Sequence, residues 1–287
     1  MRWNSRILAE TDCLMTLRLV YHGETTIPVE IEGFTPEWAC DKPLAEIERF
    51  EIFHGNRKIP LAELFTVTGN PDDQHFEFSG NLAGVHWIGA QMTCGRIDIH
   101  GPCGRHLGSE MRGGEIHVAG DAADWVGPEM RGGLIHVRGN AGHLVGAAYR
   151  GSAKGMRGGT ILIDGNAGNE IGLTMRRGMI AIGGSAGDLL GFNLIAGTVL
   201  VFGNCGIRPG AGMRRGTLGL FGPNQPTLLP SFRFAATARP QIVRVMLQHL
   251  SQQGMTSHDE LLTADFDFYQ GDLVALGRGE ILFPHKR

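Results

Sequence analysis

The sequence has little lysine, few cysteines and no long hydrophobic run. It contains 22 arginines but only 4 lysines, and the net charge is −3. Without an excess of basic charge, electrostatics gives no reason to expect a nucleic-acid partner. The 5 cysteines include no CxxC pair, which argues against a disulfide framework or a zinc ribbon. No apolar run is long enough for a membrane span and no signal-peptide core is found, so we expect a cytoplasmic protein.

Glycine, in contrast, is abundant and periodic, with 44 residues in 287. Residues 101–119 read GPCGRHLGSEMRGGEIHVA and residues 120–138 read GDAADWVGPEMRGGLIHVR, two copies of one 19-residue unit. Such a repeat fixes the architecture and must be recognised first. A unit at 139–164 carries seven extra residues, close to the segment YRGSAKG at 149–155. The units begin at Gly80, Gly101, Gly120, Gly139, Gly165, Gly184 and Gly203, and Gly222 closes the series.

Apolar residues occupy fixed columns of this unit. The sixteenth and eighteenth positions, such as Ile116 and Val118, are aliphatic in every unit and lie on one face of a strand. One coil could not bury that face alone, so the coils must stack. We therefore predict a mainly β fold: a right-handed parallel β-helix of seven coils of about 19 residues, between an N-terminal β cap and a C-terminal α/β cap. A left-handed helix of hexapeptide turns would prefer about 18 residues per coil, so it is disfavoured.

Three regions are expected along the chain. Residues 1–79 form a β-rich cap, residues 80–222 the β-helix, and residues 223–287 a second cap with one amphipathic helix. In the first cap, a strand at 13–21 is predicted to pair with one at 26–31. A further strand is predicted at 49–53, a helical turn at 59–64, and short strands at 65–67 and 74–78.

The second cap is predicted to begin with a helix over 239–253, between Pro240 and Gly254. A capping box is predicted from Ser257 to Glu260, and it would start one further helical turn. Strand structure is expected over 266–276, followed by a turn at 277–279.

The GxxGxxxGxxMRGGxIxV repeat resembles the glycine-rich β-helix in the C subunit of formylmethanofuran dehydrogenase. That fold is shared with the C-terminal domain of glutamate synthase large subunits. The insertion YRGSAKGMRGG and the segment FDFYQGDLVALGRGEIL at 266–282 also resemble the same family of C subunits. The resemblance covers nearly the whole chain. It implies a component of an enzyme complex with no active site of its own.

The resemblance further implies a structural role in one-carbon transfer. In methylotrophic bacteria, the related formyltransferase/hydrolase complex acts in formaldehyde oxidation: it passes a formyl group from tetrahydromethanopterin to methylofuran and releases formate. The partners of this chain would be the hydrolase-like A and B subunits and the formyltransferase D, with zinc in a partner and no cofactor on this chain. The alternative is the C subunit of an archaeal tungsten or molybdenum formylmethanofuran dehydrogenase, which uses methanofuran. The high proportion of arginine favours the bacterial complex.

Two other functions stay open. One is a β-helix acyltransferase that works alone, which would need a base between coils, such as His143 or His106. The other is a spacer domain like that of glutamate synthase, which would hold catalytic domains apart. The length of the chain and the segment at 266–282 argue against the second.

The residues themselves suggest no convincing catalytic set. The seventeenth position places Asp98, His117 and His136 on three successive coils, where they could share a metal. A solvated or interface ladder is the simpler interpretation, because side chains of a flat ladder run parallel and do not converge. Cys103 and Cys205 occupy the small third position, which alanine fills in other coils, so we expect them in the core.

The twelfth position carries a column of arginines. Stacking like charges one coil apart is unfavourable unless something anionic neutralises them. The arginines could be separated by solvent, or they could form an anionic partner surface, for which their planar fork suits carboxylates. The hypothesis is that they bind acidic segments of a partner protein or the glutamyl tail of a furan cofactor. The column consists of Arg112, Arg131, Arg157, Arg176 and Arg214, with Ile195 in the gap.

Overall fold

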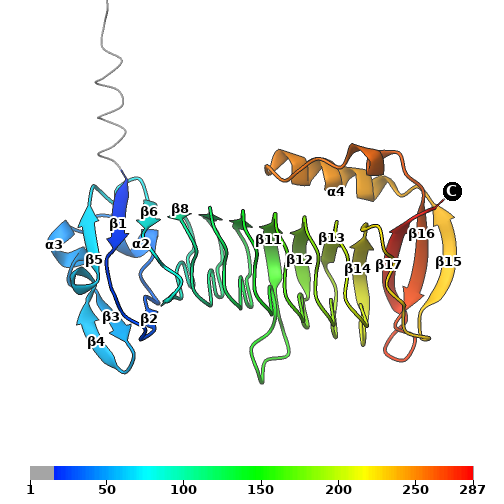
Figure 1. Ribbon diagram of the computed structural model, residues 1–287, viewed down its shortest axis with the longest axis horizontal. Coiled ribbons are helices and arrows are strands. Elements are labelled where there is room, and N and C mark those ends of the chain that lie inside the picture. The colour runs from blue at the N-terminus through cyan, green and yellow to red at the C-terminus, as the bar shows by residue number, and fades with distance from the viewer. Residues whose placement is uncertain (1–15, 287) are drawn as a thin grey trace, which may run out of the picture.

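The computed structural model of the protein describes residues 16–286. Over that range the chain has a mainly β fold with two sheets, as predicted. The larger sheet has 13 strands in the order β15-β16-β17-β14-β13-β12-β11-β10-β9-β8-β6-β1-β5, and the smaller has 4 in the order β4-β3-β2-β7. Figure 1 shows one elongated body, with the first strands at one end and the C-terminal strands at the other.

The middle of the large sheet consists of parallel strands from successive repeats. Each strand pairs in register with the next, so that Ile97 lies beside Ile116 and Val199 beside Leu218. The hydrophobic repeat of the sequence thus becomes a stack in space (Figure 1). The strands are β8 (Arg96–His100), β9 (Glu115–Val118), β10 (Leu134–Val137), β11 (Arg157–Ile163), β12 (Arg177–Ile182), β13 (Thr198–Val201) and β14 (Arg215–Leu220).

A second, thinner ladder joins the coils at the third position of the repeat. Single parallel bridges run from Leu82 through Cys103 and four alanines to Cys205. The extra residues of the fourth unit do not disturb the stack, because Ile135 still pairs with Ile161. Further backbone hydrogen bonds join the coils at their corners, for example from Gly127 to Leu107, so each coil is held to its neighbours on several sides.

The inward columns are buried as predicted. Side chains at the sixteenth and eighteenth positions of the seven units are at most 3% exposed, and the methionines of the eleventh position are 0% exposed. All belong to one apolar cluster that continues into both ends of the molecule. Because burying one such side chain contributes about 1.5–3 kcal/mol, the stacked columns supply the main stabilisation. Cys103 is 3% exposed and Cys205 packs half-buried against the same cluster.

The corners of the coils require left-handed backbone conformations. Gly133 has a φ of +91°, and a Cβ atom there would lie 2.7 Å from the carbonyl oxygen of Gly114 in the coil before it. The sixth position adopts positive φ without glycine, for example 63° at His106 and 65° at Trp125. This conformation costs about 1–3 kcal/mol for such residues. It persists because each of their N–H groups donates to a carbonyl of the next coil, as His106 does to Asp124.

The N-terminal region differs in part from its prediction. Strand β1 (Leu17–Tyr21) falls within the predicted strand, whose first residues, 13–15, lie outside the described range. Its predicted partner at 26–31 is wrong: β1 pairs with β5 (Phe65–Thr68) and with β6 (His75–Ser79). Strand β6 pairs in parallel with β8 and so links this region to the coils.

Residues 26–31 contribute instead to the small sheet. Strand β2 (Val29–Glu30) lies between β3 (Glu51–His54) and β7 (Val85–His86), because the backbone of the first coil pairs with it. Strand β4 (Arg57–Pro60) completes that sheet. Three short helical segments accompany the strands: α2 (Pro36–Ala39), α3 (Leu44–Ile47) and the 3-10 helix η1 (Leu61–Glu63).

The C-terminal strands extend the same large sheet. Strand β17 (Arg278–Pro284) pairs in parallel with β14, and β16 (Phe266–Gly271) and β15 (Arg233–Ala238) follow in antiparallel order. The predicted strand at 266–276 ends at Gly271, because residues 272–277 form the loop of the β16–β17 hairpin.

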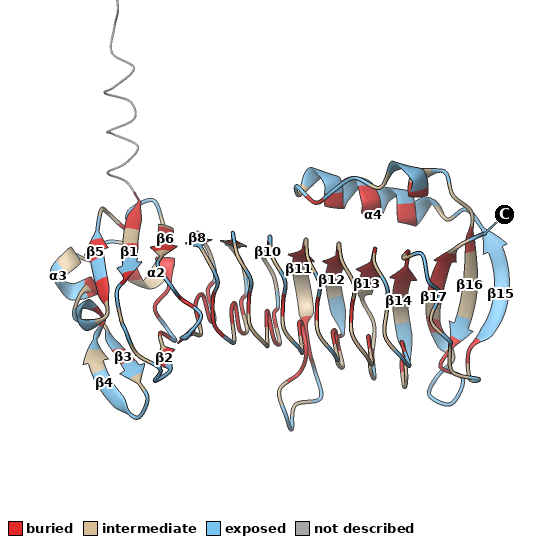
Figure 2. Cartoon of the chain, in the orientation of Figure 1, coloured by how far each residue is buried: buried red, intermediate tan, exposed pale blue. Residues whose placement is uncertain are grey.

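Helix α4 (Gln241–Gln252) confirms the predicted helix and folds back along the outer face of the large sheet (Figure 1). Its buried side faces the strands, and its other side is exposed (Figure 2). Val243, Met246 and Leu250 pack there against Leu162 and Leu200. The capping box predicted at 257–260 is wrong: His258 precedes the 3-10 helix η2 (Asp259–Leu262) without a side-chain cap, and the Ser257 hydroxyl bonds the Asp259 carboxylate instead.

Candidate functional site

The predicted arginine column lies along one edge of the coil stack, where the strands begin. The backbone N–H of Arg131 donates to the carbonyl of Met111 at 2.7 Å, and that of Arg214 donates to Leu194 at 2.7 Å. The same contact recurs at each coil, so these residues stand directly above one another, roughly 4.8 Å apart. Ile195 occupies the column between Arg176 and Arg214, as predicted.

The two halves of this edge differ in how the arginines are neutralised. In the N-terminal half, Arg131 donates to the Glu110 carboxylate at 2.9 Å. Glu110 and Glu129 occupy the tenth position of their units, where Thr174 and Asn193 stand in the later coils. The tenth position therefore provides carboxylates only to the first arginines.

Arg157 lies between the two halves. It is half-buried, and its Nε atom has no hydrogen-bond partner in the structure. Within residues 16–286, Arg112, Arg176 and Arg214 make no side-chain ion pair either, and each is exposed. The sequence thus located the column, whereas the pairing of Arg131 with Glu110 becomes clear only from the stacked coils.

A hollow of about 390 Å³ opens at the C-terminal half of this edge. Its lining residues are Arg176, Arg177, Ile195, Ala196, Arg214, Arg215 and Leu276. Two arginine pairs thus stand on either side of a small apolar floor. The hollow includes Arg177 and Arg215, which were not among the predicted site residues.

The polar ladder of Asp98, His117 and His136 is in register, as the repeat predicts. Each member already has a nearby partner. His75 Nε2 lies 2.6 Å from the Asp98 carboxylate, His117 lies 3.1 Å from Glu115, and His136 lies 2.9 Å from Asp164. Among the described residues, no group of three histidine, cysteine or acidic side chains is arranged to hold a metal.

His136 is not solvated, although its column faces outward. Its side chain is 0% exposed, and burial lowers its pKa against the opposing effect of Asp164. The neighbouring Arg138 donates both to Asp164, at 3.1 Å, and to the carbonyl of Gly254 just beyond α4, at 2.9 Å. The segment that follows α4 over the sheet is therefore linked to this ladder through Arg138.

An aromatic cluster that the sequence did not predict lies on the sixth position of the first coils. The His106 ring stacks on Trp87 with centroids 4.2 Å apart and faces Trp125 at 6.0 Å. Tyr149, from the inserted segment, stacks on Trp125 at 5.0 Å. Its hydroxyl lies 3.0 Å from His106 Nδ1 and 2.8 Å from the buried Ser109 hydroxyl. One role of the insertion is thus to cover these rings.

This environment bears on the two histidines considered as bases. Burial, with the nearby charges of His86 and Arg105, lowers the pKa of His106 to about 4, so its ring is neutral at pH 7. Burial raises the pKa of Tyr149 to about 12. His143 accepts a hydrogen bond on Nδ1 from the Asn169 backbone at 2.8 Å. Both rings thus use a nitrogen in contacts between coils.

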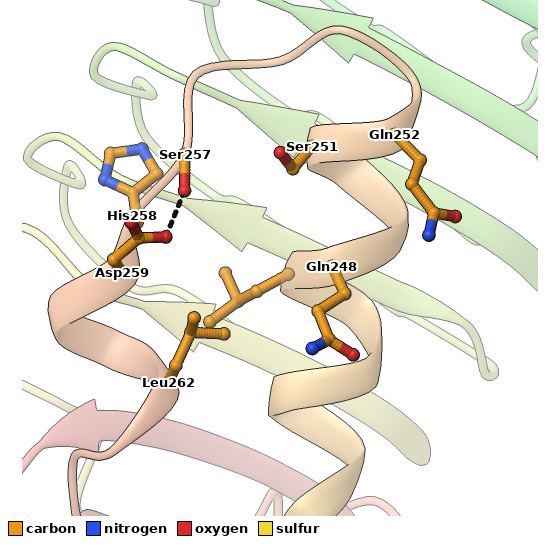
Figure 3. Close-up of a pocket in the computed structure, with 8 residues that line it drawn as sticks. Gln248, Ser251, Gln252, Ser257, His258, Asp259 and Leu262 are labelled. Carbon is orange, nitrogen blue, oxygen red and sulfur yellow. Dashed lines mark hydrogen bonds between the residues drawn. The ribbon is translucent and has the colours of Figure 1, made fainter.

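A second hollow, of about 370 Å³, lies between α4 and η2 (Figure 3). Gln248 and Gln252 line one side, and Ser257 and His258 the other. The His258 ring stacks on Phe202 with centroids 4.0 Å apart, and its Nδ1 faces Glu260 at 3.4 Å. No hydrogen bond joins Ser257 to His258 in this described segment, so the two do not form a nucleophile–base pair.

The cysteines in the third column are poor nucleophiles. Burial raises the pKa of both the Cys103 and the Cys205 thiol to about 12. The neutral thiol is then the species at pH 7, and it acts as a small apolar side chain.

Comparison with known proteins identifies the repeat. The GXGXG motif family matches residues 83–230, which is more than half of the chain. This chain belongs to the GXGXG motif family. A chain of the formyltransferase/hydrolase complex (FhcABCD) from Methylorubrum extorquens, solved in complex with methylofuran, has the same fold with a TM-score of 0.85. It is 33% identical, and the alignment covers 94% of this chain and 100% of that one.

The C subunits of formylmethanofuran dehydrogenases are similar to part of this GXGXG chain, which confirms the expected resemblance. That of the molybdenum-containing enzyme 1 of Methanothermobacter thermautotrophicus is 42% identical over 90 residues, 31% of this chain and 22% of the relative. That of the tungsten-containing enzyme 2 of Methanothermobacter wolfeii is 37% identical over 79 residues, 26% of this chain and 29% of the relative. The matched segments span less than a third of the length of these curated relatives.

Proposed function

We propose that this chain is the structural subunit of a one-carbon transfer complex of the formyltransferase/hydrolase type. That complex would pass a formyl group between tetrahydromethanopterin and methylofuran and release formate, with catalysis on other subunits. The observation that carries the proposal is the match over 94% of this chain to a component of such a complex, at a TM-score of 0.85. Function follows here from a shared assembly and not from a catalytic site of this chain.

The partners and cofactors of the proposed complex follow from the same relationship. Hydrolase-like A and B subunits and a formyltransferase D would assemble on this chain, with zinc in a partner and methylofuran carried by the complex. Free thiols fit the cytoplasm as the proposed location. No helix among the described residues is long and apolar enough to cross a bilayer.

A second candidate is the C subunit of an archaeal formylmethanofuran dehydrogenase containing tungsten or molybdenum. The 42% identity over 90 residues to such a protein favours it. The segment is short, however, whereas a chain of the bacterial complex matches over 94% of this chain. A glutamate-synthase-like spacer or an acyltransferase that works alone receives no comparable support.

The proposed role fits a rigid column with two ends. We interpret the chain as a right-handed parallel β-helix of seven coils at 80–222, with one cap at 1–79 and another at 223–287. The in-register strands and the bridge ladder support the stacking. Strand β17 and helix α4 support a C-terminal cap that both extends the sheet and covers its outer face.

The arginine column is the proposed contact surface for anionic groups of a partner. Arginine binds carboxylates through two parallel hydrogen bonds, and all column members except Arg131 have no ion pair in the described structure. The surface consists of Arg112, Arg131, Arg157, Arg176 and Arg214.

The test is purification of the tagged chain from its native source in mild salt, with mass spectrometry of the proteins that co-elute. We expect larger subunits, zinc, and both formyl transfer and formate release in the same fraction. Tungsten or molybdenum with a pterin would select the archaeal type of enzyme. A well-folded chain that elutes alone would contradict the proposal.

A further inference from the structure

We propose that the hollow between Arg176, Arg177, Arg214 and Arg215, together with the exposed apolar loop of the β16–β17 hairpin, docks one acidic segment of a partner polypeptide that also carries apolar side chains. This inference rests on the proposed function only in expecting such a partner within a complex. It assigns the contact to the C-terminal end of the arginine edge and not to the whole column.

The first step is charge. None of these four arginines makes a side-chain hydrogen bond or ion pair within residues 16–286. A fifth, Arg278 on β17, is the register partner of Arg215 and is exposed as well. Like charges on adjacent strands repel unless something neutralises them. Because nothing within the described chain does so, this surface is complementary to an anionic ligand.

The carboxylates of this region are already engaged. Asp272 accepts hydrogen bonds from the backbone N–H groups of Gly212 and Val274, each at 3.0 Å. Glu280 accepts one from the Thr217 hydroxyl at 2.9 Å. Neither pairs with the arginines, in contrast to Glu110, which pairs with Arg131 in the other half.

The second step is shape. Ile195 and Ala196 occupy, in the coil between the two arginine pairs, the same two positions that the arginines occupy in the coils on either side. The pairs are therefore two coils apart, roughly 9.6 Å at the usual spacing between strands. At that spacing each pair can bind a carboxylate of its own when both carboxylates belong to one extended chain. A single small anion would have to draw the side chains of both pairs inward.

The third step is the apolar rim. Val274 is 86% exposed, Leu273 is 55% exposed and Leu276 is 46% exposed, and Leu276 also lines the hollow. Their loop lies at the end of the sheet where β14 begins (Figure 1). It is fixed there because the Asp272 N–H donates to Met213 and its carboxylate accepts from Gly212.

Arginine is enriched at the strongest contact points between proteins. Exposed aliphatic side chains beside it add apolar surface that a partner can bury. A free anion or a purely acidic chain would use the charges and leave the apolar loop in water. The combination therefore favours a polypeptide with both acidic and apolar side chains.

The experiment compares two 12-residue peptides by titration calorimetry on the full chain. One alternates pairs of glutamates with single leucines, and the other has serine in place of leucine. We expect the leucine peptide to bind at least about tenfold more tightly. Val274→Ser should remove most of that difference. Arg177→Glu/Arg215→Glu should abolish binding of both peptides.

The matched control is Arg49→Glu/Arg57→Glu, the same charge change on two exposed arginines at the other end of the molecule. It should bind both peptides like the wild type, and the melting temperature of each variant should stay close to that of the wild type. Equal binding of the two peptides would indicate a simple anion site and overturn the proposal. Equal losses in the control and in Arg177→Glu/Arg215→Glu would indicate a non-specific charge effect and overturn it as well.

The same variants in the co-purified complex separate this inference from the proposed function. If wild type captures the other subunits and Arg177→Glu/Arg215→Glu captures them equally well, the docking inference alone is wrong. If wild type captures none but binds the leucine peptide in the hollow, the proposed function is wrong and the docking site stands.

Discussion

The first and last coils share one backbone but differ on their surfaces. On strands β8 to β10 the outward-facing residues are polar: Asp98, His117 and His136. The side chain of each one contacts a polar or charged side chain nearby. On strands β11 to β13 the residues of the same column are apolar, and helix α4 covers them. They are Leu162, Ala181 and Leu200. Along the arginine edge, the early coils supply acids and the later ones do not. The repeat thus specifies the stack, while the variable columns specify what each stretch of it contacts.

The largest expected effect concerns the covered half. Leu162 is 0% exposed beneath α4. Leu162→Asp should lower the free energy of unfolding by about 4 kcal/mol, because it buries an unpaired charge and detaches the helix. Urea unfolding measures this, with Leu162→Met as control at under about 1.5 kcal/mol. A small effect of the aspartate would mean that α4 does not depend on this face.

The second effect compares a coil with the inserted segment. Gly133 and Gly151 have φ values of +91° and +88°, but a Cβ atom would meet the Gly114 carbonyl oxygen at the first and nothing within 4 Å at the second. Gly151→Ala should cost only the backbone strain, about 1 kcal/mol. Gly133→Ala should cost about 2–4 kcal/mol, because strain and collision add. Similar losses in thermal unfolding would contradict the tight stacking of the coils.

The third effect depends on pH and belongs to the aromatic cluster of the first coils. Because the pKa of His106 falls to about 4 on folding, the unfolded chain binds more protons between about pH 6.5 and 4. The stability supplied by the neutral ring is therefore complete above pH 6.5 and is lost as the pH falls toward 4. After allowance for solvent screening, the change should be about 1–2 kcal/mol.

His106→Gln is the matched variant for that measurement. Urea unfolding at several pH values should give a shallower decline for the variant than for the wild type, since the other titrating groups are common to both. Parallel curves would show that His106 titrates normally in the folded protein.

The smallest effect compares the two halves of the arginine edge. Arg131→Ala removes a partly exposed ion pair with Glu110 and should lower stability by less than about 1 kcal/mol. Arg177→Ala should leave stability unchanged or raise it slightly, because it relieves repulsion from Arg157, its register partner. Differential scanning calorimetry at low salt would reveal the sign, and equal losses would contradict the difference between the halves.

The stack could be predicted from sequence because residues that recur with a fixed period become neighbours in space. A period of 19 residues brings Ile116 over Ile97 and Met111 over Met92. The pairing of residues 26–31 could not, because alternation defines a strand but not its neighbour in the sheet. The position of α4 had a signal that was not used. The outward column changes from Asp98, His117 and His136 to Leu162, Ala181 and Leu200, and that change marks where the helix packs.

For the candidate site, the sequence located the arginine column but not its hollow. The hollow depends on Leu276, which returns to the coils only through the pairing of β17 with β14. The aromatic cluster was missed because the sixth position is aromatic only in the first coils and varies in the later ones, and because Tyr149 reaches the rings from the inserted segment.

The inserted segment also shows how such a chain can gain residues without a change in its stack of coils. Seven residues enter within the fourth coil, yet the strands on its two sides still pair in register, with Ile135 beside Ile161. Chain added at this corner projects sideways (Figure 1), so it lengthens the sequence without lengthening the stack. The tip of the segment around Gly151, where an added Cβ atom would meet nothing within 4 Å, is thus a natural place for new surface, whether by evolution or by grafting a label.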